Sequence, residues 1–180
     1  MSWEFTILDG IQNIFQSSVM DTVMPLITHL CDGGIFWILL AFVFLMMPKT
    51  RRVGCFIAAA LLVDVLLVNM LVKPLVNRIR PYEINTMVTL LINKPIDSSF
   101  PSGHTAASFA ATSGLFMAGR KNWGIAALVL SGVIAFSRLY LYVHFPTDVL
   151  GGICFGVLSG VLGGLLIKLI EKQREKKNRV

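Results

Sequence analysis

Five long stretches of the chain lack Asp, Glu, Lys and Arg, apart from Asp64 inside the second one. They are 33–48, 53–63 with 65–72, 98–119, 122–137 and 149–167. Crossing a hydrocarbon layer about 30 Å thick takes around 20 helical residues. Each stretch is therefore expected to form a transmembrane helix, and the shorter ones extend into the charged residues that flank them. The pattern predicts an all-α, polytopic membrane helix bundle with five transmembrane helices.

The N-terminal part has a different pattern. Between residues 3 and 15, apolar side chains such as Trp3, Ile7 and Ile11 share one helical face, and polar ones lie mostly opposite. This amphipathic period is typical of a helix lying in the membrane interface. Residues 19–31 are expected to form a second short or re-entrant piece, broken by Asp32-Gly33-Gly34.

We therefore expect a single membrane-embedded domain with three regions. The predicted regions are interfacial or re-entrant helices over 1–32, a transmembrane core over 33–167 and a basic cytoplasmic tail over 168–180. The composition supports this class, because 55% of the residues are apolar and only 14% are charged. Soluble domains are roughly 45–50% apolar and about 25% charged. A disordered chain, a disulfide-rich secreted domain and an ordinary cytosolic enzyme are all excluded.

Basic residues outnumber acidic ones by 16 to 10, and their positions predict the orientation. A five-span alternation brings three basic clusters to one side: Lys49, Arg51 and Arg52; Arg120 and Lys121; Lys168, Lys172, Arg174, Lys176, Lys177 and Arg179. That side, with the C-terminus, is expected to be cytoplasmic. The tail could also bind anionic lipid headgroups, although a topogenic role is favoured. No nucleic-acid binding is expected, because no basic patch is interleaved with exposed aromatic residues on a soluble domain.

Three polar clusters fall on the predicted outer side, where topology does not call for basic residues. The first contains Lys73 and Arg80, which are seven positions apart. Seven steps of 100° bring them close to one helical face if the helix continues through Pro74. Two cations on one face can clamp one anion. Arg78 points elsewhere on such a helix and is expected to anchor at the headgroups.

The second cluster opens the third span. Ser99 is the expected N-cap, with Pro101 in the first helical turn. Gly103 lets a ligand approach the backbone closely, and a helix N-terminus suits a phosphate group. Ser102 adds a hydroxyl group at the same place. His104 then lies one turn into the helix, beside the bound group.

The third cluster links spans four and five and contains Arg138, His144 and Asp148. Pro146 predicts a helix that starts there, with Asp148 in its first turn and His144 just before it. Asp148 can then orient His144 by a hydrogen bond to one ring nitrogen and leave the other nitrogen free to attack.

Together the clusters supply cations, two histidines, an orienting carboxylate and a helix N-terminus. This combination predicts phosphoryl transfer through a histidine, with Lys73, Arg80 and Arg138 holding the charge on the phosphoryl oxygens. Neither a metal nor another cofactor is expected, because side chains supply the cations and no carboxylate cluster for Mg²⁺ is evident.

The three motifs, K-x(6)-R-P, P-S-G-H and S-R-x(5)-H-x(3)-D, occur in this order. They resemble the three-part signature of the type 2 phosphatidic acid phosphatases, a superfamily that includes undecaprenyl-diphosphate phosphatases, phosphatidylglycerophosphate phosphatases, glucose-6-phosphatase and vanadium haloperoxidases. The resemblance runs from about residue 20 to 165. It implies that His144 attacks phosphorus and becomes phosphohistidine, that Asp148 orients it, and that His104 protonates the leaving oxygen and then helps to activate water. It implies these phosphate-binding residues: Lys73, Arg80, Ser102, Gly103 and Arg138.

The expected activity is thus removal of a terminal phosphate from a membrane lipid at the outer face. Undecaprenyl diphosphate is the first candidate substrate, because the predicted site faces outward, the chain is short and a pocket at membrane level suits a lipid tail. Phosphatidic acid and phosphatidylglycerophosphate are the alternatives. A non-catalytic lipid-phosphate binder or transporter is the rival of another class, although binding alone needs no nucleophile such as His144.

Other positions have structural interpretations first. His29 lies outside the motifs and is expected to be a tolerated interfacial residue. Asp64 lies in the second span, where a carboxyl group is costly, and is expected to bond to Ser108, Thr112 or Ser131. Glycines recur every four residues along span five and allow close helix approach. Packing inside the bundle is the favoured use of this glycine ridge, and a homodimer is the alternative: Gly152, Gly156, Gly160 and Gly164.

Overall fold

The structure is a computed structural model that describes residues 2–178, and all the regular elements in that range are helical. The predicted all-α class is confirmed. Arg179, expected in the basic tail, lies outside the described residues. The elements are α1 (Ser2–Phe15), α2 (Ser18–His29), the 3-10 turn η1 (Asp32–Gly34), α3 (Ile35–Met46), α4 (Arg51–Asp64), the π-helical η2 (Val65–Val72), α5 (Lys73–Val76), α6 (Pro81–Ile84), α7 (Gly103–Met117), α8 (Lys121–Tyr140) and α9 (Pro146–Lys177).

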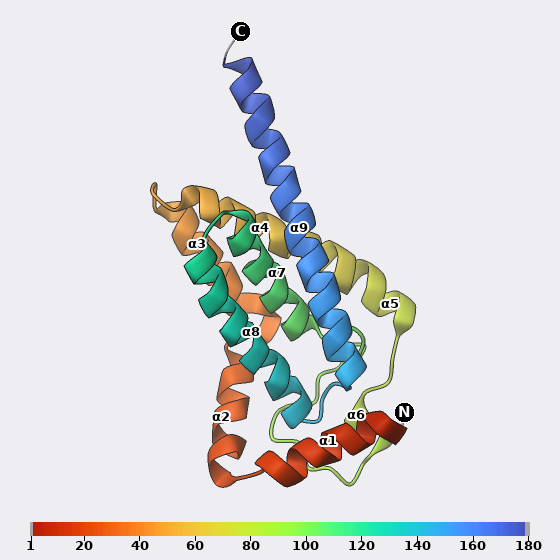
Figure 1. The fold of residues 1–180 in the computed structure, drawn as a ribbon. Helices are drawn as coiled ribbons and strands as arrows, with labels where there is room; N and C mark the ends of the chain where they lie inside the picture. Colours follow the sequence, from red (N-terminus) through yellow and green to blue (C-terminus); the bar gives the residue numbers. More distant parts are fainter. Residues whose placement is uncertain (1, 179–180) are drawn as a thin grey trace.

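The bundle is built around α7, which packs against α4, α8 and α9. Figure 1 shows α1 crossing one end of the bundle and α9 projecting beyond the opposite end. The loops that join α3 to α4 and α7 to α8 lie toward the end from which α9 projects. The three basic clusters therefore gather toward one end of the molecule. The segments that carry the predicted site residues meet toward the other end.

The outward faces of the helices are apolar, as a lipid environment requires. Large hydrophobic side chains that are at least half exposed include Leu39 and Phe42 on α3, Leu62 on α4 and Leu166 on α9. In water such a surface would be unfavourable, and in a bilayer it matches the lipid tails. These faces fit a multi-pass membrane protein.

Fewer than five stretches of the described residues have the length and composition of a complete span. By length and composition, three stretches can cross a membrane, Arg51–Ile84, Lys121–Tyr140 and Pro146–Lys177, and the pair formed by α2 and Asp32–Met46, bent by 41°, can count as a fourth. Helix α7 has 15 residues and at 1.5 Å per residue extends only about 22 Å. It is shorter than the run 98–119 because residues 98–102 and 118–119 are not helical. The expected count of five spans is not confirmed.

The helix that begins with α4 changes from α-helical to π-helical geometry before it ends. Pro74 has no N–H to donate, and the eight residues Val65–Val72, which end immediately before the short helix Lys73–Val76, form wider π-helical turns. Asn77 then adopts φ 43°, in the left-handed region, and the helix ends there. The residues that follow, including Arg80, leave the helix axis.

The glycine ridge of α9 faces α7 inside the bundle. A Cβ atom added at Gly156 would lie 2.4 Å from the carbonyl oxygen of Ala106, and one at Gly160 would lie 2.3 Å from Cβ of Ser113. These distances leave no room for any side chain, so the two backbones are in direct contact. Packing within the chain is the observed use of the ridge. The alternative, a homodimer through this face, is not supported, because α7 already covers it.

This contact predicts a position-specific effect on stability. Leu at position 160 should lower the free energy of unfolding by about 1–3 kcal/mol or more, because overpacking forces backbone shifts. Gly132 on α8 is the matched control, since a Cβ added there meets nothing within 4 Å. Thermal unfolding in detergent should show a lower midpoint for Gly160→Leu and no loss for Gly132→Leu. Equal midpoints for the two variants would contradict the packing described here.

Candidate active site

The side chains of Lys73 and Arg80 lie close together, but not on one helical face as the sequence predicted. The expectation of one shared helical face is wrong, because the helix ends at Asn77 and Arg80 follows in extended backbone at φ −85°, ψ 156°. Both side chains are nevertheless buried, at 9% and 2% exposure. They converge on one carboxylate, that of Asp97.

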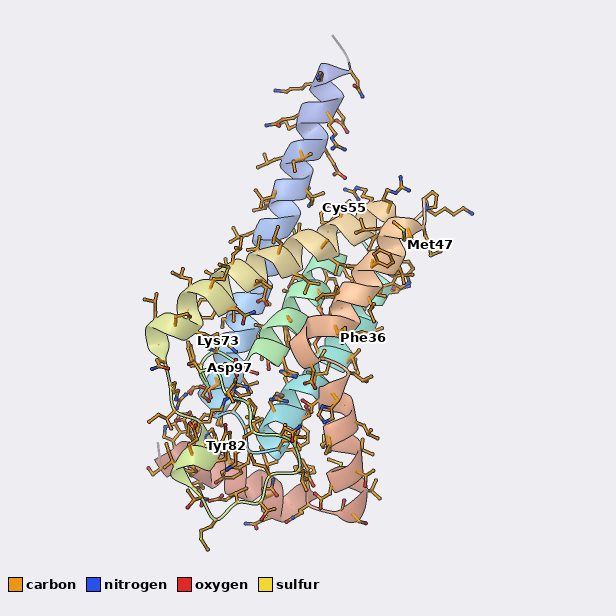
Figure 2. The ribbon with its side chains drawn as sticks, turned by 180° about the vertical axis from the view of Figure 1, so that it is seen from behind. Phe36, Met47, Cys55, Lys73, Tyr82 and Asp97 are labelled. Atoms are coloured by element: carbon orange, nitrogen blue, oxygen red, sulfur yellow. The ribbon has the colours of Figure 1, made fainter. Side chains whose placement is uncertain are left out.

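Asp97 bridges the two cations. Its carboxylate accepts a short hydrogen bond from Nζ of Lys73 and another, 2.7 Å long, from Nη2 of Arg80. Nε of Arg80 also donates to the Asp97 carbonyl oxygen at 2.9 Å. Figure 2 shows Lys73 and Asp97 close together, with Tyr82 on the far side of Asp97 from Lys73. Asp97 lies in a segment with no regular secondary structure and no motif, so no sequence pattern pointed to it.

The charge of Asp97 is set by these contacts. Burial acts to raise the pKa of its carboxyl group, but hydrogen bonding and charge from Lys73 and Arg80 outweigh burial and lower the pKa to about 2. Asp97 is therefore an anion at any physiological pH. It stands between the two cations that were expected to hold a phosphate.

The start of α7 presents Gly103 and His104 to this region. A Cβ atom added at Gly103 would lie 3.2 Å from Nζ of Lys73, so glycine allows the ammonium group to sit against the backbone. Ser99 is not the N-cap that was expected, since the helix begins four residues later with Ser102 as its N-cap. Ser102 is fully buried, and its hydroxyl accepts from Oγ1 of Thr105 at 2.9 Å.

His144 follows α8 in a buried loop, where its two ring nitrogens have different partners. Nδ1 lies 2.7 Å from the carbonyl oxygen of Ser99. Because a carbonyl oxygen only accepts, Nδ1 carries the proton in the neutral ring. Nε2 therefore has a free lone pair, which accepts from Nη1 of Arg80 at 3.2 Å. This is the nitrogen that can attack an electrophile.

The protonation state of His144 suits that role. Burial lowers the pKa of its imidazole to about 3, and the positive charges of Arg80 and Arg138 act in the same direction, against the nearby carboxylate of Asp148. The ring is therefore neutral, and its free nitrogen is nucleophilic, throughout the physiological range.

Asp148 lies behind His144 without making the hydrogen bond that was expected. Its Oδ2 atom is 3.7 Å from Nδ1 of His144, beyond hydrogen-bond distance. That oxygen instead accepts from Oγ of Ser99 at 2.5 Å and from the backbone N–H of Phe145 at 2.8 Å. Asp148 thus fixes the residue whose carbonyl oxygen holds the imidazole, and its influence on His144 passes through Ser99.

Arg78 has a different place from the one expected. It is not an anchor at the headgroups, because its guanidinium donates to Asp148 at 2.5 Å and to Glu4 at 2.7 Å. It also lies over the ring of Phe145, 4.2 Å from the centroid. Glu4 on α1 is 3% exposed, so the N-terminal helix supplies a buried partner for the site. The sequence pattern did not indicate this partner on α1, so it pointed to the headgroups instead.

Arg138 is the third buried cation, at 2% exposure near the end of α8. Its Nη1 donates to Oγ1 of Thr28 on α2 through a short hydrogen bond. Its Nε has no hydrogen-bond partner among residues 2–178. A buried guanidinium with a free donor fits a site that receives an anion.

A cavity of about 260 Å³ brings these groups together. Six of the eight expected site residues line it, and Ser102 and Asp148 lie behind its wall. The lining residues are His29, Asp32, Lys73, Arg80, Ile92, Asn93, Lys94, Pro95, Asp97, Gly103, His104, Arg138 and His144. No group of three or more His, Cys, Asp or Glu side chains in the described chain is arranged to hold a metal ion.

Asp64 lines a second cavity of about 300 Å³ that shares Lys73, Asp97 and His104 with the first. The hydroxyls expected to bind Asp64 are engaged elsewhere: Thr112 with Ser131 at 2.9 Å, and Ser108 with Trp37 and the His104 carbonyl. Its Oδ1 atom has no hydrogen-bond partner within the part of the chain described. The expected structural bond is therefore wrong.

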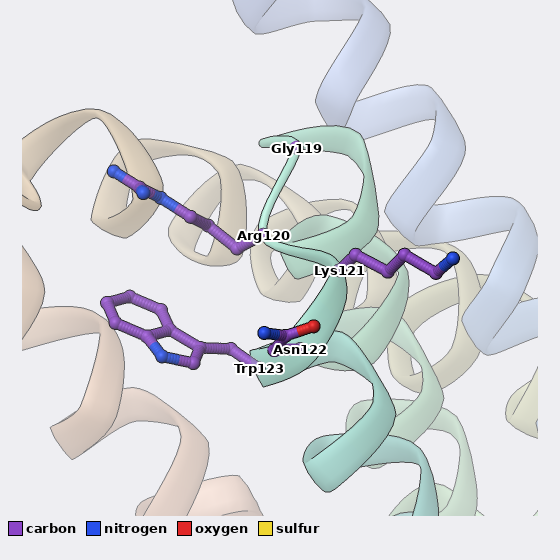
Figure 3. Close-up of a pocket in the computed structure, with 5 residues that line it drawn as sticks. All are labelled: Gly119, Arg120, Lys121, Asn122 and Trp123. Carbon is purple, nitrogen blue, oxygen red and sulfur yellow. The ribbon is translucent and has the colours of Figure 1, made fainter.

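A third cavity, of about 330 Å³, lies at the loop between α7 and α8 and is drawn in Figure 3. It is lined by Gly119, Arg120, Lys121, Asn122 and Trp123. The Arg120 guanidinium lies 5.4 Å from the centroid of the Trp123 ring. Basic and aromatic side chains of this kind are typical of a membrane interface. No histidine or carboxylate lines this cavity, so the candidate active site is the one around His144.

The cavity thus combines a neutral histidine with three buried cations in a helical membrane protein. A sequence model of the PAP2 superfamily matches residues 53–173, and the chain belongs to that superfamily. The undecaprenyl-diphosphatase BcrC of Bacillus subtilis is 31% identical over 161 residues, which cover 88% of this chain and 80% of that protein. An undecaprenyl-diphosphatase of Sulfolobus acidocaldarius is 28% identical over 120 residues, 67% of this chain and 58% of its own length.

Solved structures share the fold over most of their length. The crystal structure of Aquifex aeolicus LpxE matches with a TM-score of 0.74 and 26% identity, covering 88% of this chain and 93% of that one. A PAP2-type phosphatidylglycerolphosphate phosphatase of Bacillus subtilis matches with a TM-score of 0.70 and 28% identity, covering 96% and 86%. The expected superfamily is confirmed, and with it the class of membrane lipid phosphatase.

The bridge formed by Asp97 predicts an effect on anion inhibition. A bound phosphate or vanadate must displace this carboxylate from Lys73 and Arg80, so neutral Asp97→Asn should tighten inhibition. We expect a decrease of about tenfold in the inhibition constant for vanadate, near 1.4 kcal/mol. Steady-state hydrolysis at increasing vanadate concentrations measures this inhibition constant. Asp9→Asn is the control, because Asp9 accepts a hydrogen bond from Tyr142 outside the cavity. Weaker inhibition of Asp97→Asn would mean that Asp97 does not compete with the anion.

Proposed function

We propose that this membrane lipid phosphatase hydrolyses the terminal phosphate of undecaprenyl diphosphate through a phosphohistidine on His144. The observation that carries the proposal is the free Nε2 lone pair of His144, 3.2 Å from the Arg80 guanidinium and in one cavity with Lys73 and Arg138. A nucleophile is of no use to a binder or transporter. The arrangement therefore favours catalysis over that rival.

The first step transfers the phosphoryl group to the enzyme. Nε2 of His144 forms a bond to phosphorus while the bond from phosphorus to the bridging oxygen breaks. His104 gives its proton to that oxygen, so the lipid leaves as a monophosphate. Lys73, Arg80 and Arg138, with the backbone at Gly103, hold the negative charge on the phosphoryl oxygens. The buried Ser102 supports this end of α7.

The second step regenerates the enzyme. Neutral His104 takes a proton from a water molecule, the water oxygen bonds to phosphorus, and the bond between phosphorus and Nε2 breaks. Inorganic phosphate is released. Asp148 keeps the imidazole oriented through both steps by holding Ser99, whose carbonyl oxygen accepts from Nδ1. We propose that no metal ion and no other cofactor takes part, because side chains supply the charge.

The relatives support undecaprenyl diphosphate as the substrate. Two of them are named undecaprenyl-diphosphatase, and the Bacillus protein covers most of this chain. Phosphatidylglycerophosphate and phosphatidic acid are the alternative substrates. The solved Bacillus subtilis structure, with a TM-score of 0.70, supports the first of these two. The cavity recognises a phosphate group common to all these lipids. Turnover of the three lipids, compared in one detergent, decides between them.

We also propose an orientation. The basic clusters lie at the end of the bundle opposite the site, and the positive-inside rule places that end in the cytoplasm. The site then faces the extracytoplasmic side of the cell membrane, and the C-terminus is cytoplasmic. Residues 1–32 are placed at the interface, 33–167 in a five-pass core and 168–180 in the tail. In this arrangement α7 is a short fifth crossing enclosed by its neighbours.

Replacing the nucleophile tests the proposal directly. His144→Ala should lose at least about 10³-fold in turnover of undecaprenyl diphosphate, because a catalytic unit without its nucleophile retains only residual activity. Wild-type protein should release phosphate in the presence of EDTA, and acid-labile phosphate should be trapped on the wild type but not on the variant. Unchanged thermal unfolding controls for misfolding. Normal turnover of His144→Ala would disprove the nucleophile, and loss of wild-type activity in EDTA would disprove metal independence.

The protonation state of His144 makes a separate prediction. Because its pKa is lowered to about 3, its neutral form persists as the pH falls, and protonation should not begin until well below pH 5. NMR of ¹⁵N-histidine-labelled protein in detergent, with His144→Ala to assign the signal, should show Nδ1 protonated and Nε2 unprotonated from pH 8 to pH 5. A titration midpoint above pH 5 would contradict the environment described for the ring.

A further inference from the structure

The break between α2 and α3 brings a second carboxylate to the active site. Asp32 begins the 3-10 turn there, and Gly33 and Gly34 both have positive φ angles, 60° and 73°. Such angles favour glycine and let the chain turn sharply between two helices. The turn places Asp32 in the wall of the cavity that holds His144.

Asp32 joins two histidines. Its Oδ1 atom lies 2.9 Å from Nε2 of His104, and its Oδ2 atom lies 2.7 Å from Nδ1 of His29. An ionised carboxylate only accepts, so each of these ring nitrogens carries a proton. Nδ1 of His104 is then the nitrogen that can exchange a proton with the substrate. His29, expected to have no function, braces the carboxylate from the other side.

The protonated ring of His104 needs the negative charge of Asp32 because of the cations that surround it. The protonated ring has to form in a cavity that also holds Lys73, Arg80 and Arg138, and these cations disfavour it. The other carboxylate in the cavity wall, Asp97, is paired with Lys73 and Arg80. Asp32 is the carboxylate in direct contact with His104.

We propose that Asp32 is the positioning residue of the acid–base histidine, an inference that rests on the proposed function. Its carboxylate fixes the ring of His104 by accepting from Nε2 and stabilises the positive charge while Nδ1 holds the proton destined for the leaving oxygen. In the second step the same contact stabilises His104 as Nδ1 takes a proton from water. Asp32 stays ionised throughout, so no proton is left unaccounted for.

The leaving group distinguishes positioning from a merely structural role. Expulsion of an alkoxide, as from phosphatidic acid, needs a proton, whereas p-nitrophenolate leaves without one. For Asp32→Asn we expect kcat with phosphatidic acid as the lipid substrate to fall about 10- to 100-fold, less than the roughly 10²–10⁴-fold contribution of a complete acid–base group. KM should stay unchanged. The pre-steady-state burst of p-nitrophenolate from p-nitrophenyl phosphate should stay within about threefold of wild type.

Two variants serve as comparisons. Asp32→Glu keeps the negative charge and should recover part of the lipid turnover. This variant also tests the proposal if Asp32→Asn folds poorly. Asp21→Asn is the matched control on the preceding helix, α2, where Asp21 accepts from the Tyr140 hydroxyl instead of a histidine. It should leave both reactions unchanged. Lipid turnover and burst falling together in Asp32→Asn, or wild-type values for both, would overturn the proposal.

A measurement without substrate separates this inference from the proposed function. In ¹H–¹⁵N spectra, the hydrogen-bonded Nε2 proton of His104 should give a protected signal in wild type that is lost in Asp32→Ala. Retention of that signal in Asp32→Ala would overturn the role of Asp32. If wild type shows the signal but hydrolyses none of the three lipids, the proposed function fails while the contact stands.

Discussion

The carboxylate of Asp148 is fully buried at the start of α9, and the geometry of the site depends on how its charge is satisfied. An isolated carboxylate in such a place would be very costly, so every lone pair needs a donor. The donors come from Ser99, Phe145 and Arg78, and Arg78 in turn holds Glu4 on α1. Segments that lie far apart in sequence are thereby fixed around one group.

The same arrangement orients the nucleophile indirectly. The Ser99 hydroxyl donates to Asp148, and the Ser99 carbonyl oxygen accepts from Nδ1 of His144. The position of the Asp148 carboxylate therefore fixes the orientation of the imidazole through this one residue. The close contact between α7 and α9 at the glycine ridge makes this possible, because it holds the first turns of both helices side by side. The geometry of the active site at the end of the bundle therefore depends on helix packing in its middle.

Carboxylates compensate part of the positive charge in the cavity before any substrate arrives. Lys73 and Arg80 are held by Asp97, His104 by Asp32, and Arg138 by the neutral hydroxyl of Thr28. A phosphate that enters displaces the Asp97 carboxylate from Lys73 and Arg80, and it also brings negative charge to Arg138, which pairs with no carboxylate among the described residues. Asp32 and Thr28 come from the N-terminal part, outside the residues 53–173 that match the superfamily. The N-terminal segment thus supplies contacts that the shared signature does not describe.

The sequence by itself determined the helical class, the apolar outward faces and most of the groups that line the cavity, because these follow from local periodicity and from the order of the three motifs. Six expected residues, among them Lys73, Arg138 and His144, do share one cavity. The tertiary structure alone decided the end of the helix at Asn77, the shortness of α7, and the contacts of Arg78, Asp97 and Asp32. These depend on turns and on pairs of residues distant in the chain, whose relative positions are set only when helices pack and each buried charge finds its partner.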